Sequence, residues 1–176
     1  MKYANIKNYD IANGKGIRVS LFVSGCTHHC KGCFNEVAWD FNFGEDFTQE
    51  VENQIIEMMK PSYIKGLTLL GGEPFEVSNQ MALLPFIKRV KEIYPNKDIW
   101  AYTGYLFDQE LLNPSRARCD VTDELLSYID ILVDGRFVLE LKDVALKFRG
   151  SENQRIIDVK KSLKENKVIL IEELMN

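Results

Sequence analysis

The chain has 176 residues, of which 45% are apolar and 27% are charged, and its formal net charge is −4. These values are typical of a soluble globular protein and exclude extended disorder, so we expect residues 1–176 to form a single domain. An acidic chain without a basic run is also unsuited to nucleic-acid binding, which depends on clustered Lys and Arg.

The sequence gives no sign of membrane insertion or export. No apolar run approaches about 18 residues, and residues 1–5 lack the apolar core of a signal peptide. We therefore expect a cytoplasmic protein without a membrane partner. In that reducing compartment, clustered cysteines are more often metal ligands or catalytic groups than disulfide partners.

Apolar patterning predicts strands and helices that alternate along the chain. Four short apolar runs next to turn residues are expected to be strands: 17–23, 66–70, 99–103 and 131–133. Helical spacing of apolar residues follows three of them, with Thr48 and Thr122 as N-caps and Pro85 near the start of the middle helix. Beyond Arg155, two apolar runs flank a Lys-rich segment, which predicts a helix and one final edge strand.

This alternation predicts a parallel sheet whose ligands bind beyond the carboxyl ends of the strands. A complete eight-fold barrel needs about 250 residues. We therefore expect an open partial (βα) barrel with a mainly parallel sheet, or a smaller doubly wound sheet. A barrel that is open on one side has room for a large partner.

Three of the four cysteines lie on one short loop, as Cys26-x-x-x-Cys30-x-x-Cys33, directly after the first expected strand. Three thiolates leave one iron of a four-iron cluster open to a substrate, whereas a cluster that only transfers electrons uses four cysteines. The alternative is a closed zinc site that adds His28 or His29, although chelation by such close neighbours is sterically awkward.

A second motif, Gly71-Gly72-Glu73-Pro74, follows the second expected strand. The glycines allow the backbone to approach a ligand closely, and the Glu73 carboxylate suits an ammonium group. The alternative is an ordinary turn, which is the more frequent role of a Gly-Gly pair.

Together with further segments, these motifs resemble the radical S-adenosylmethionine superfamily, and specifically the activating proteins of anaerobic ribonucleotide reductase. The segments that carry the resemblance span most of the chain: 13–18, 22–35, 71–74, 134–137 and 148–158. The wider superfamily often has an aromatic residue before the third cysteine, whereas this chain has Gly32 there and Phe34 after the cysteine. The activating subfamily shows the same small residue, which leaves open which side chain stacks near the adenine.

The resemblance implies a radical-SAM type of partial barrel, with the cluster loop at 26–33, and an oxidoreductase of anaerobic metabolism. A reduced [4Fe–4S] cluster passes one electron to S-adenosylmethionine, and the resulting 5′-deoxyadenosyl radical takes a hydrogen atom from a glycine. That glycine belongs to the catalytic subunit of anaerobic ribonucleotide reductase, a glycyl-radical protein. A flavodoxin or ferredoxin-like protein is the implied electron donor.

The resemblance also implies a set of site residues. Catalytic and metal-binding roles fall on the three cysteines of the loop: Cys26, Cys30 and Cys33. Cofactor-binding roles fall on the loop and on the ends of the later strands: Gly32, Cys33, Phe34, Gly71, Gly72, Glu73, Thr103 and Asp134. For Thr103 and Asp134, an ordinary role at a strand end is an equal alternative.

Two other functions stay open at this point. One is activation of a different glycyl-radical enzyme, and the other is a zinc-stabilised interaction module without chemistry. Cys119 lacks ligand spacing and is expected to be a passive thiol. Arg18 is expected to point into or beneath the sheet and to form a surface salt bridge.

Overall fold

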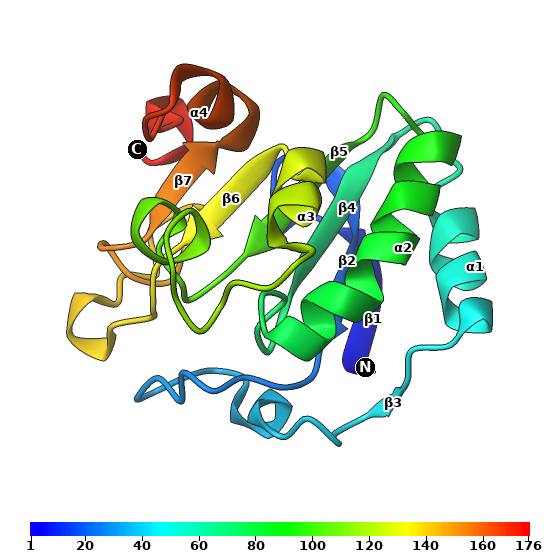
Figure 1. The fold of residues 1–176 in the computed structure, drawn as a ribbon, viewed down its shortest axis with the longest axis horizontal. Coiled ribbons are helices and arrows are strands. Elements are labelled where there is room, and N and C mark those ends of the chain that lie inside the picture. The colour runs from blue at the N-terminus through cyan, green and yellow to red at the C-terminus, as the bar shows by residue number, and fades with distance from the viewer.

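The computed structural model describes residues 1–176, and its centre is one seven-stranded sheet (Figure 1). The strands lie side by side in the order β3-β1-β2-β4-β5-β6-β7. Their bounds are β1 (Lys2–Asp10), β2 (Ile17–Val23), β3 (Glu45–Asp46), β4 (Ile64–Gly71), β5 (Asp98–Tyr102), β6 (Ile131–Asp134) and β7 (Arg155–Asp158).

The sheet is mixed, and this corrects the expected partial barrel with a mainly parallel sheet. β2, β4, β5 and β6 pair in parallel, but β1 pairs antiparallel with β2 and β3, and β7 pairs antiparallel with β6. Parallel neighbours need a long crossover, usually a helix. Only the short loop 11–16 joins β1 to β2, and no α-helix lies between β6 and β7. At both edges of the sheet, neighbouring strands therefore run antiparallel.

The chain forms four α-helices: α1 (Gln49–Met58), α2 (Val77–Ile93), α3 (Thr122–Tyr128) and α4 (Val159–Glu165). The expected cap of α1 is confirmed, since the Thr48 side chain accepts a hydrogen bond from the Val51 N–H. The cap predicted for α3 is wrong, because Thr122 is its first helical residue and its hydroxyl donates to Gln80 Oε1 at 2.7 Å. None of the helices has the length and apolar character needed to cross a membrane.

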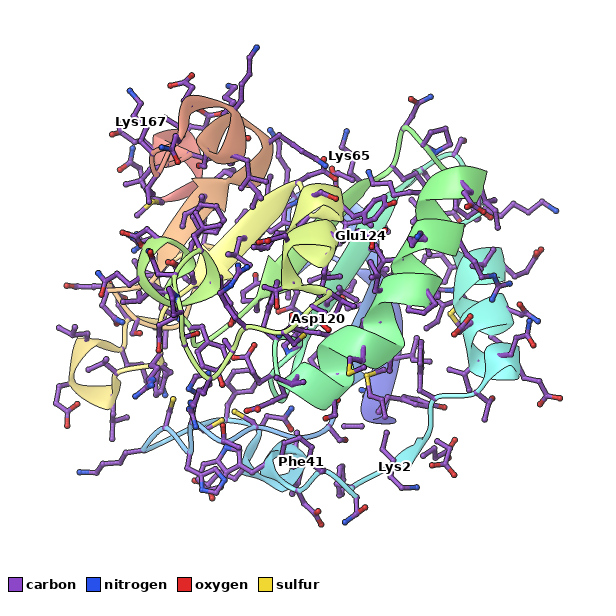
Figure 2. The ribbon with its side chains drawn as sticks, in the orientation of Figure 1. Lys2, Phe41, Lys65, Asp120, Glu124 and Lys167 are labelled. Carbon is purple, nitrogen blue, oxygen red and sulfur yellow. The ribbon has the colours of Figure 1, made fainter.

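The two faces of the sheet differ. On one face, β-strand residues such as Leu21, Leu69 and Ala101 join the main apolar core, which α1, α2 and α3 cover (Figure 1). The opposite face, here called the second face, carries Trp100 and Tyr102 and packs against the segment before β7 and the C-terminal residues. Most charged side chains lie on the outside, as Figure 2 shows for residues such as Lys65, Glu124 and Lys167.

Arg18 lies on the second face and is fully buried, so the surface salt bridge expected for it is wrong. Its Nη2 lies 2.5 Å from Asp98 Oδ1, and its Nε donates to Thr68 Oγ1 at 2.7 Å. Its Nη1 also donates to the Lys15 carbonyl at 3.1 Å. Arg18 therefore anchors the loop 11–16 to the sheet.

Candidate functional site

A cavity of about 340 Å³ lies beside the carboxyl ends of β2, β4 and β5. This is the edge at which ligands of parallel strands are expected. Most of the predicted site residues contribute to its wall: Cys26, Cys30, Cys33, Phe34, Gly71, Gly72, Glu73 and Thr103. The structure thus brings the cysteine loop and the Gly-Gly-Glu-Pro turn together on one cavity.

Backbone hydrogen bonds hold the cysteine loop against this turn. The Gly72 N–H donates to the Val23 carbonyl at 2.7 Å, and the Glu73 N–H donates to the Gly25 carbonyl at 2.8 Å. A Cβ atom added at Gly72 would lie 2.6 Å from the Gly25 carbonyl oxygen, a distance that real side chains do not tolerate. Gly72 is therefore required for the close approach of two protein segments.

The Asn35 N–H donates a hydrogen bond to the Cys33 sulfur at 3.4 Å. Backbone groups of His28 and His29 act on Cys26, and that of Phe137 acts on Cys30, in the direction that lowers the pKa of each thiol. Such N–H donors stabilise thiolates and tune iron–sulfur clusters, so the donor set fits three ligands of a cluster. No three Cys, His, Asp or Glu side chains converge on one metal position in this conformation.

Burial controls the ionisation of the thiols. It raises the pKa of Cys26 to about 12, and the negative charges of Glu73 and Glu76 add to the shift while backbone hydrogen bonds oppose it. Burial also raises the pKa of Cys30, with a further contribution from Cys33. Because metal ligation requires the thiolate, binding of a cation must offset these upward shifts.

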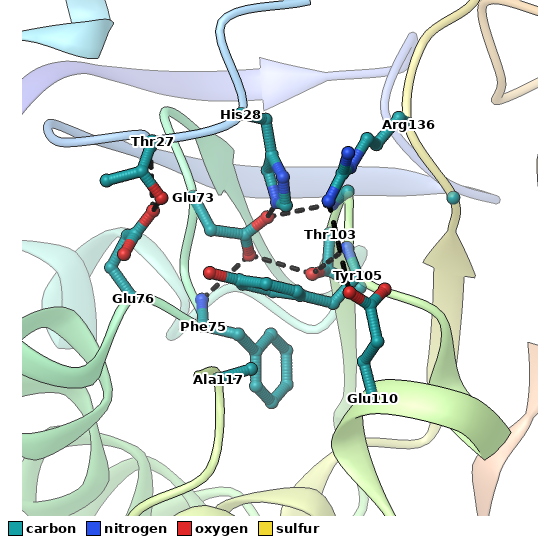
Figure 3. A network of polar contacts seen from close by, with 12 residues as sticks. Thr27, His28, Glu73, Phe75, Glu76, Thr103, Tyr105, Glu110, Ala117 and Arg136 are labelled. Atoms are coloured by element: carbon teal, nitrogen blue, oxygen red, sulfur yellow. Dashed lines mark hydrogen bonds and ion pairs between the residues drawn. The ribbon is translucent and has the colours of Figure 1, made fainter. Parts of the chain in front are cut away.

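Glu73 is the centre of a buried polar network that Figure 3 shows from close by. Its Oε1 accepts hydrogen bonds from the Phe75 N–H at 2.9 Å and from Thr103 Oγ1 at 2.8 Å. Its Oε2 accepts from the Gly104 N–H at 2.7 Å and lies 2.8 Å from His28 Nε2. One carboxylate therefore joins the cysteine loop, the turn after β4 and the end of β5.

The sequence left the roles of both histidines open, and the structure shows each imidazole engaged. His28 Nδ1 lies 3.5 Å from Arg116 Nη2, which can only donate, so the Nε2 of His28 carries the proton shared with Glu73. The His29 ring stacks on Trp39 with centroids 4.4 Å apart. Neither ring joins the cysteines in a group of side chains that could hold a metal ion.

Two predicted residues lie off the cavity wall. Asp134 is fully buried, and its carboxylate pairs with Arg155 at 2.6 Å and accepts from the Phe107 N–H at 2.8 Å. Gly32 is exposed, with a φ of +75°, and an added Cβ would meet Leu139. Their roles in cofactor binding stay predictions.

The wall also contains residues to which the sequence assigned no role. They come from the loop 11–16, from β5 and from the segment 135–154: Ala12, Asn13, Tyr102, Phe137, Leu146, Phe148, Arg149, Gly150 and Gln154. Part of this set falls within segments 13–18 and 148–158, which carry the family resemblance. For the residues inside these two segments, the resemblance was the only signal in the sequence.

Comparisons with known proteins agree with this arrangement. A family model described as a 4Fe-4S single cluster domain matches residues 12–157. The anaerobic ribonucleoside-triphosphate reductase-activating protein of Haemophilus influenzae is 48% identical over 158 residues, which cover 89% of this chain and 97% of the relative. The protein of the same name from Escherichia coli K12 is 42% identical over 88% of this chain and 96% of its own length. That of phage T4 is 38% identical over 89% of this chain and 93% of its own length.

The chain belongs to the family of anaerobic ribonucleoside-triphosphate reductase-activating proteins. The family resemblance predicted from the cysteine loop and the later segments is thus confirmed. Members of this family match the chain over nearly their whole lengths. The iron–sulfur model spans the chain from the loop 11–16 to β7 and so includes every segment that forms the cavity wall.

Proposed function

We propose that this chain activates anaerobic ribonucleoside-triphosphate reductase by generating a glycyl radical on its catalytic subunit. In this proposal Cys26, Cys30 and Cys33 hold a [4Fe–4S] cluster, and S-adenosylmethionine binds in the adjoining cavity. When bound, these groups supply a one-electron reductive cleavage of S-adenosylmethionine that leads to removal of a hydrogen atom from the target glycine.

The observation that carries the proposal is the position of the three cysteines. All three lie on the wall of one cavity beside the turn after β4, in a chain whose relatives are named as activators of this reductase. Three thiol ligands, rather than four, leave a cluster with an open iron. This supports a cluster that binds a substrate directly.

The chain's own residues have three tasks in this scheme. The backbone donors around the cysteine loop stabilise the thiolates, and the bonds of Gly72 and Glu73 fix the loop to β4. The turn 71–73 offers the negative charge of Glu73 to the amino group of the methionine moiety. Thr103 and Asp134 are proposed near the ribose, and Gly32 and Phe34 near the adenine.

The cavity wall supplies the environment for the reaction. Leu70, Phe137, Leu146 and Phe148 line it with apolar surface, which excludes water from a reactive site. Phe34 lies at the cavity with 86% of its surface exposed. Its ring is therefore free to cover a bound cofactor.

The proposal also implies partners and a compartment. A flavodoxin or ferredoxin-like protein would deliver the electron, and the reductase subunit would present its glycine at the cavity. Reduced thiols and an oxygen-sensitive cluster favour the cytoplasm of a cell growing without oxygen.

The test is reconstitution with iron and sulfide in the absence of oxygen. After reduction with dithionite, S-adenosylmethionine is added and 5′-deoxyadenosine is measured by chromatography, with and without the reductase subunit. Glycyl radical is measured by electron paramagnetic resonance. Cys30→Ala is the test variant, and Cys119→Ala is the matched control because Cys119 contacts Gln80 and Thr122 outside the site.

The proposal predicts about four irons and four sulfides per chain, and 5′-deoxyadenosine that is lost in Cys30→Ala and kept in Cys119→Ala. One zinc per chain without sulfide, and no product, would refute the enzyme and support an interaction module. Product without a radical on this reductase subunit would point to a different glycyl-radical partner.

A further inference from the structure

His28 is the only side chain between Cys26 and Cys33 that forms a hydrogen bond with the turn 71–73. Its Nε2–H donates to Glu73 Oε2 at 2.8 Å, and the His28 and Glu73 side chains are 2% and 1% exposed. The His28 ring also lines the cavity. A polar side chain that is buried between the cysteine loop and the turn can act on both.

The middle of the cysteine loop has few backbone bonds to the rest of the chain. The Thr27 N–H donates to Glu76 Oε1 at 2.7 Å. From residue 28 to residue 33, the only bond between main-chain groups is local, from the Cys33 N–H to the Cys30 carbonyl at 3.1 Å. Cys30 and Cys33 lie in this part of the loop, so their position relative to the turn depends on side-chain contacts.

The His28 ring is packed on three sides. It meets the Tyr105 ring edge-on with centroids 4.4 Å apart. Its Nδ1 lies 3.5 Å from Arg116 Nη2. A Cβ atom added at Gly104 would lie 2.5 Å from the ring, because the backbone approaches the ring so closely there. The ring is therefore a fixed part of the site, and a ligand cannot displace it from Glu73 without disturbing these contacts.

Glu73 is the fixed point to which His28 connects the loop (Figure 3). An ionised carboxylate has about four acceptor positions. Three of those on Glu73 are taken by donors from outside the cysteine loop: the Phe75 N–H, the Gly104 N–H and the Thr103 hydroxyl. His28 takes the fourth. A single N–H group therefore joins the loop to an otherwise complete network at the ends of β4 and β5.

S-adenosylmethionine is a ligand that would meet both segments at once. In the proposed function its methionine moiety binds the open iron held by the cysteine loop, and its amino group lies beside the turn 71–73. Binding to two segments is tighter when they are already held in the right relative position, because less conformational freedom is lost on binding. The hydrogen bond between His28 and Glu73 supplies this connection within the chain itself.

We propose that His28 is a positioning residue for S-adenosylmethionine, because its N–H bond to Glu73 holds the cysteine loop and the turn 71–73 in the arrangement that binds the cofactor. This inference rests on the proposed function. In this scheme His28 contacts neither the reacting atoms nor the iron, and it acts through Glu73 and the loop.

The experiment compares His28→Asn with His28→Gln, which is the matched control because both changes introduce the same polar group. The Gln amide nitrogen is as many bonds from Cα as the His Nε2 and can donate to Glu73, whereas the Asn amide nitrogen is one bond closer and cannot reach it. The dissociation constant for S-adenosylmethionine is measured by equilibrium dialysis with the reconstituted protein, together with its iron content. Amide hydrogen exchange over residues 26–33 is measured in the metal-free protein.

We expect His28→Asn to raise the dissociation constant about 10-fold, as for one lost hydrogen bond to a charged group. Exchange over residues 26–33 should be faster in this variant, because the loop opens more often. His28→Gln should bind S-adenosylmethionine within about 3-fold of the wild type and exchange at a similar rate. A residue that only stabilised the fold would give no such rescue by the longer amide.

Equal affinities or equal exchange rates in the two variants would overturn the inference and leave the proposed function intact. Tighter binding in His28→Asn than in the wild type would also overturn it, because His28 would then obstruct the site. A wild-type protein that makes no 5′-deoxyadenosine would refute the proposed function itself, and the exchange rates of the metal-free protein are measured independently of that outcome.

Discussion

Replacement of Glu73 by Gln tests the buried network that joins the cysteine loop to the sheet. Each Glu73 oxygen accepts one backbone N–H, from Phe75 or from Gly104, and neither donor can become an acceptor. The Gln NH₂ group must therefore face one of them. A hydrogen bond to a charged group contributes about 1.5 to 3 kcal/mol, and the displaced N–H stays buried. We expect the free energy of unfolding to fall by about 3 kcal/mol, a large part of the stability of a typical domain.

The assay is urea and thermal unfolding of the reduced, metal-free protein, followed by circular dichroism. For a chain of this size, about 3 kcal/mol corresponds to a Tm lower by about 6 to 12 °C. Glu76→Gln is the matched control, because a single oxygen, Oε1, accepts both bonds from Thr27 and the amide keeps that oxygen. If the free energy of unfolding of Glu73→Gln equals that of the wild type and of the control, the carboxylate does not stabilise the fold through these hydrogen bonds. The structural account of Glu73 would then be wrong.

Three further predictions concern stability. Arg18→Met should lower the free energy of unfolding by about 3 kcal/mol, as measured by urea unfolding. The change leaves the Asp98 side chain, which is 25% exposed, without its ionic partner. Burial alone would raise the pKa of Asp10, but hydrogen bonds from Ser20, Asn13 and Ala12 outweigh it and hold the pKa below its usual value. The ionised Asp10 carboxylate therefore stabilises the fold above about pH 4, and this contribution is lost at lower pH. We expect the Tm of Asp10→Asn to fall less than that of the wild type between about pH 5 and 3. Removal of a reconstituted cluster by chelation should lower the Tm by about 5 °C or more, since the cluster binds only the folded chain.

The strands that were predicted from the sequence are those formed by apolar runs. β2, β4, β5 and β6 were all expected within two residues of their ends, because each is a nearly continuous apolar run. β1 was missed, since its segment is rich in Asn and Lys and only one of its nine residues is buried. That omission removed the antiparallel edge from the prediction and led to the incorrect partial barrel.

The antiparallel pairing of β7 was not predicted either, and this explains why the surroundings of Asp134 were not foreseen. A carboxylate at the end of a parallel strand is free to meet a ligand, and the sequence analysis treated it so. In the structure β7 pairs antiparallel with β6 and places Arg155 directly opposite Asp134. Residues 21 positions apart thus form an ion pair that no local pattern indicates.

The cavity depends on the difference between the two faces of the sheet. A helix packed on the second face would bury Arg18, Ser20, Thr68 and Tyr102 against apolar side chains, at a cost for every polar group left unpaired. Loops with free main-chain groups can satisfy such residues, as the Lys15 carbonyl does for Arg18 and the Asn13 carbonyl does for Thr68. The polar residues of the strands therefore favour loops over helices on this face, and these loops, with the cysteine loop, enclose the cavity. A fully apolar second face would attract a helix and close the space in which the proposed reaction takes place.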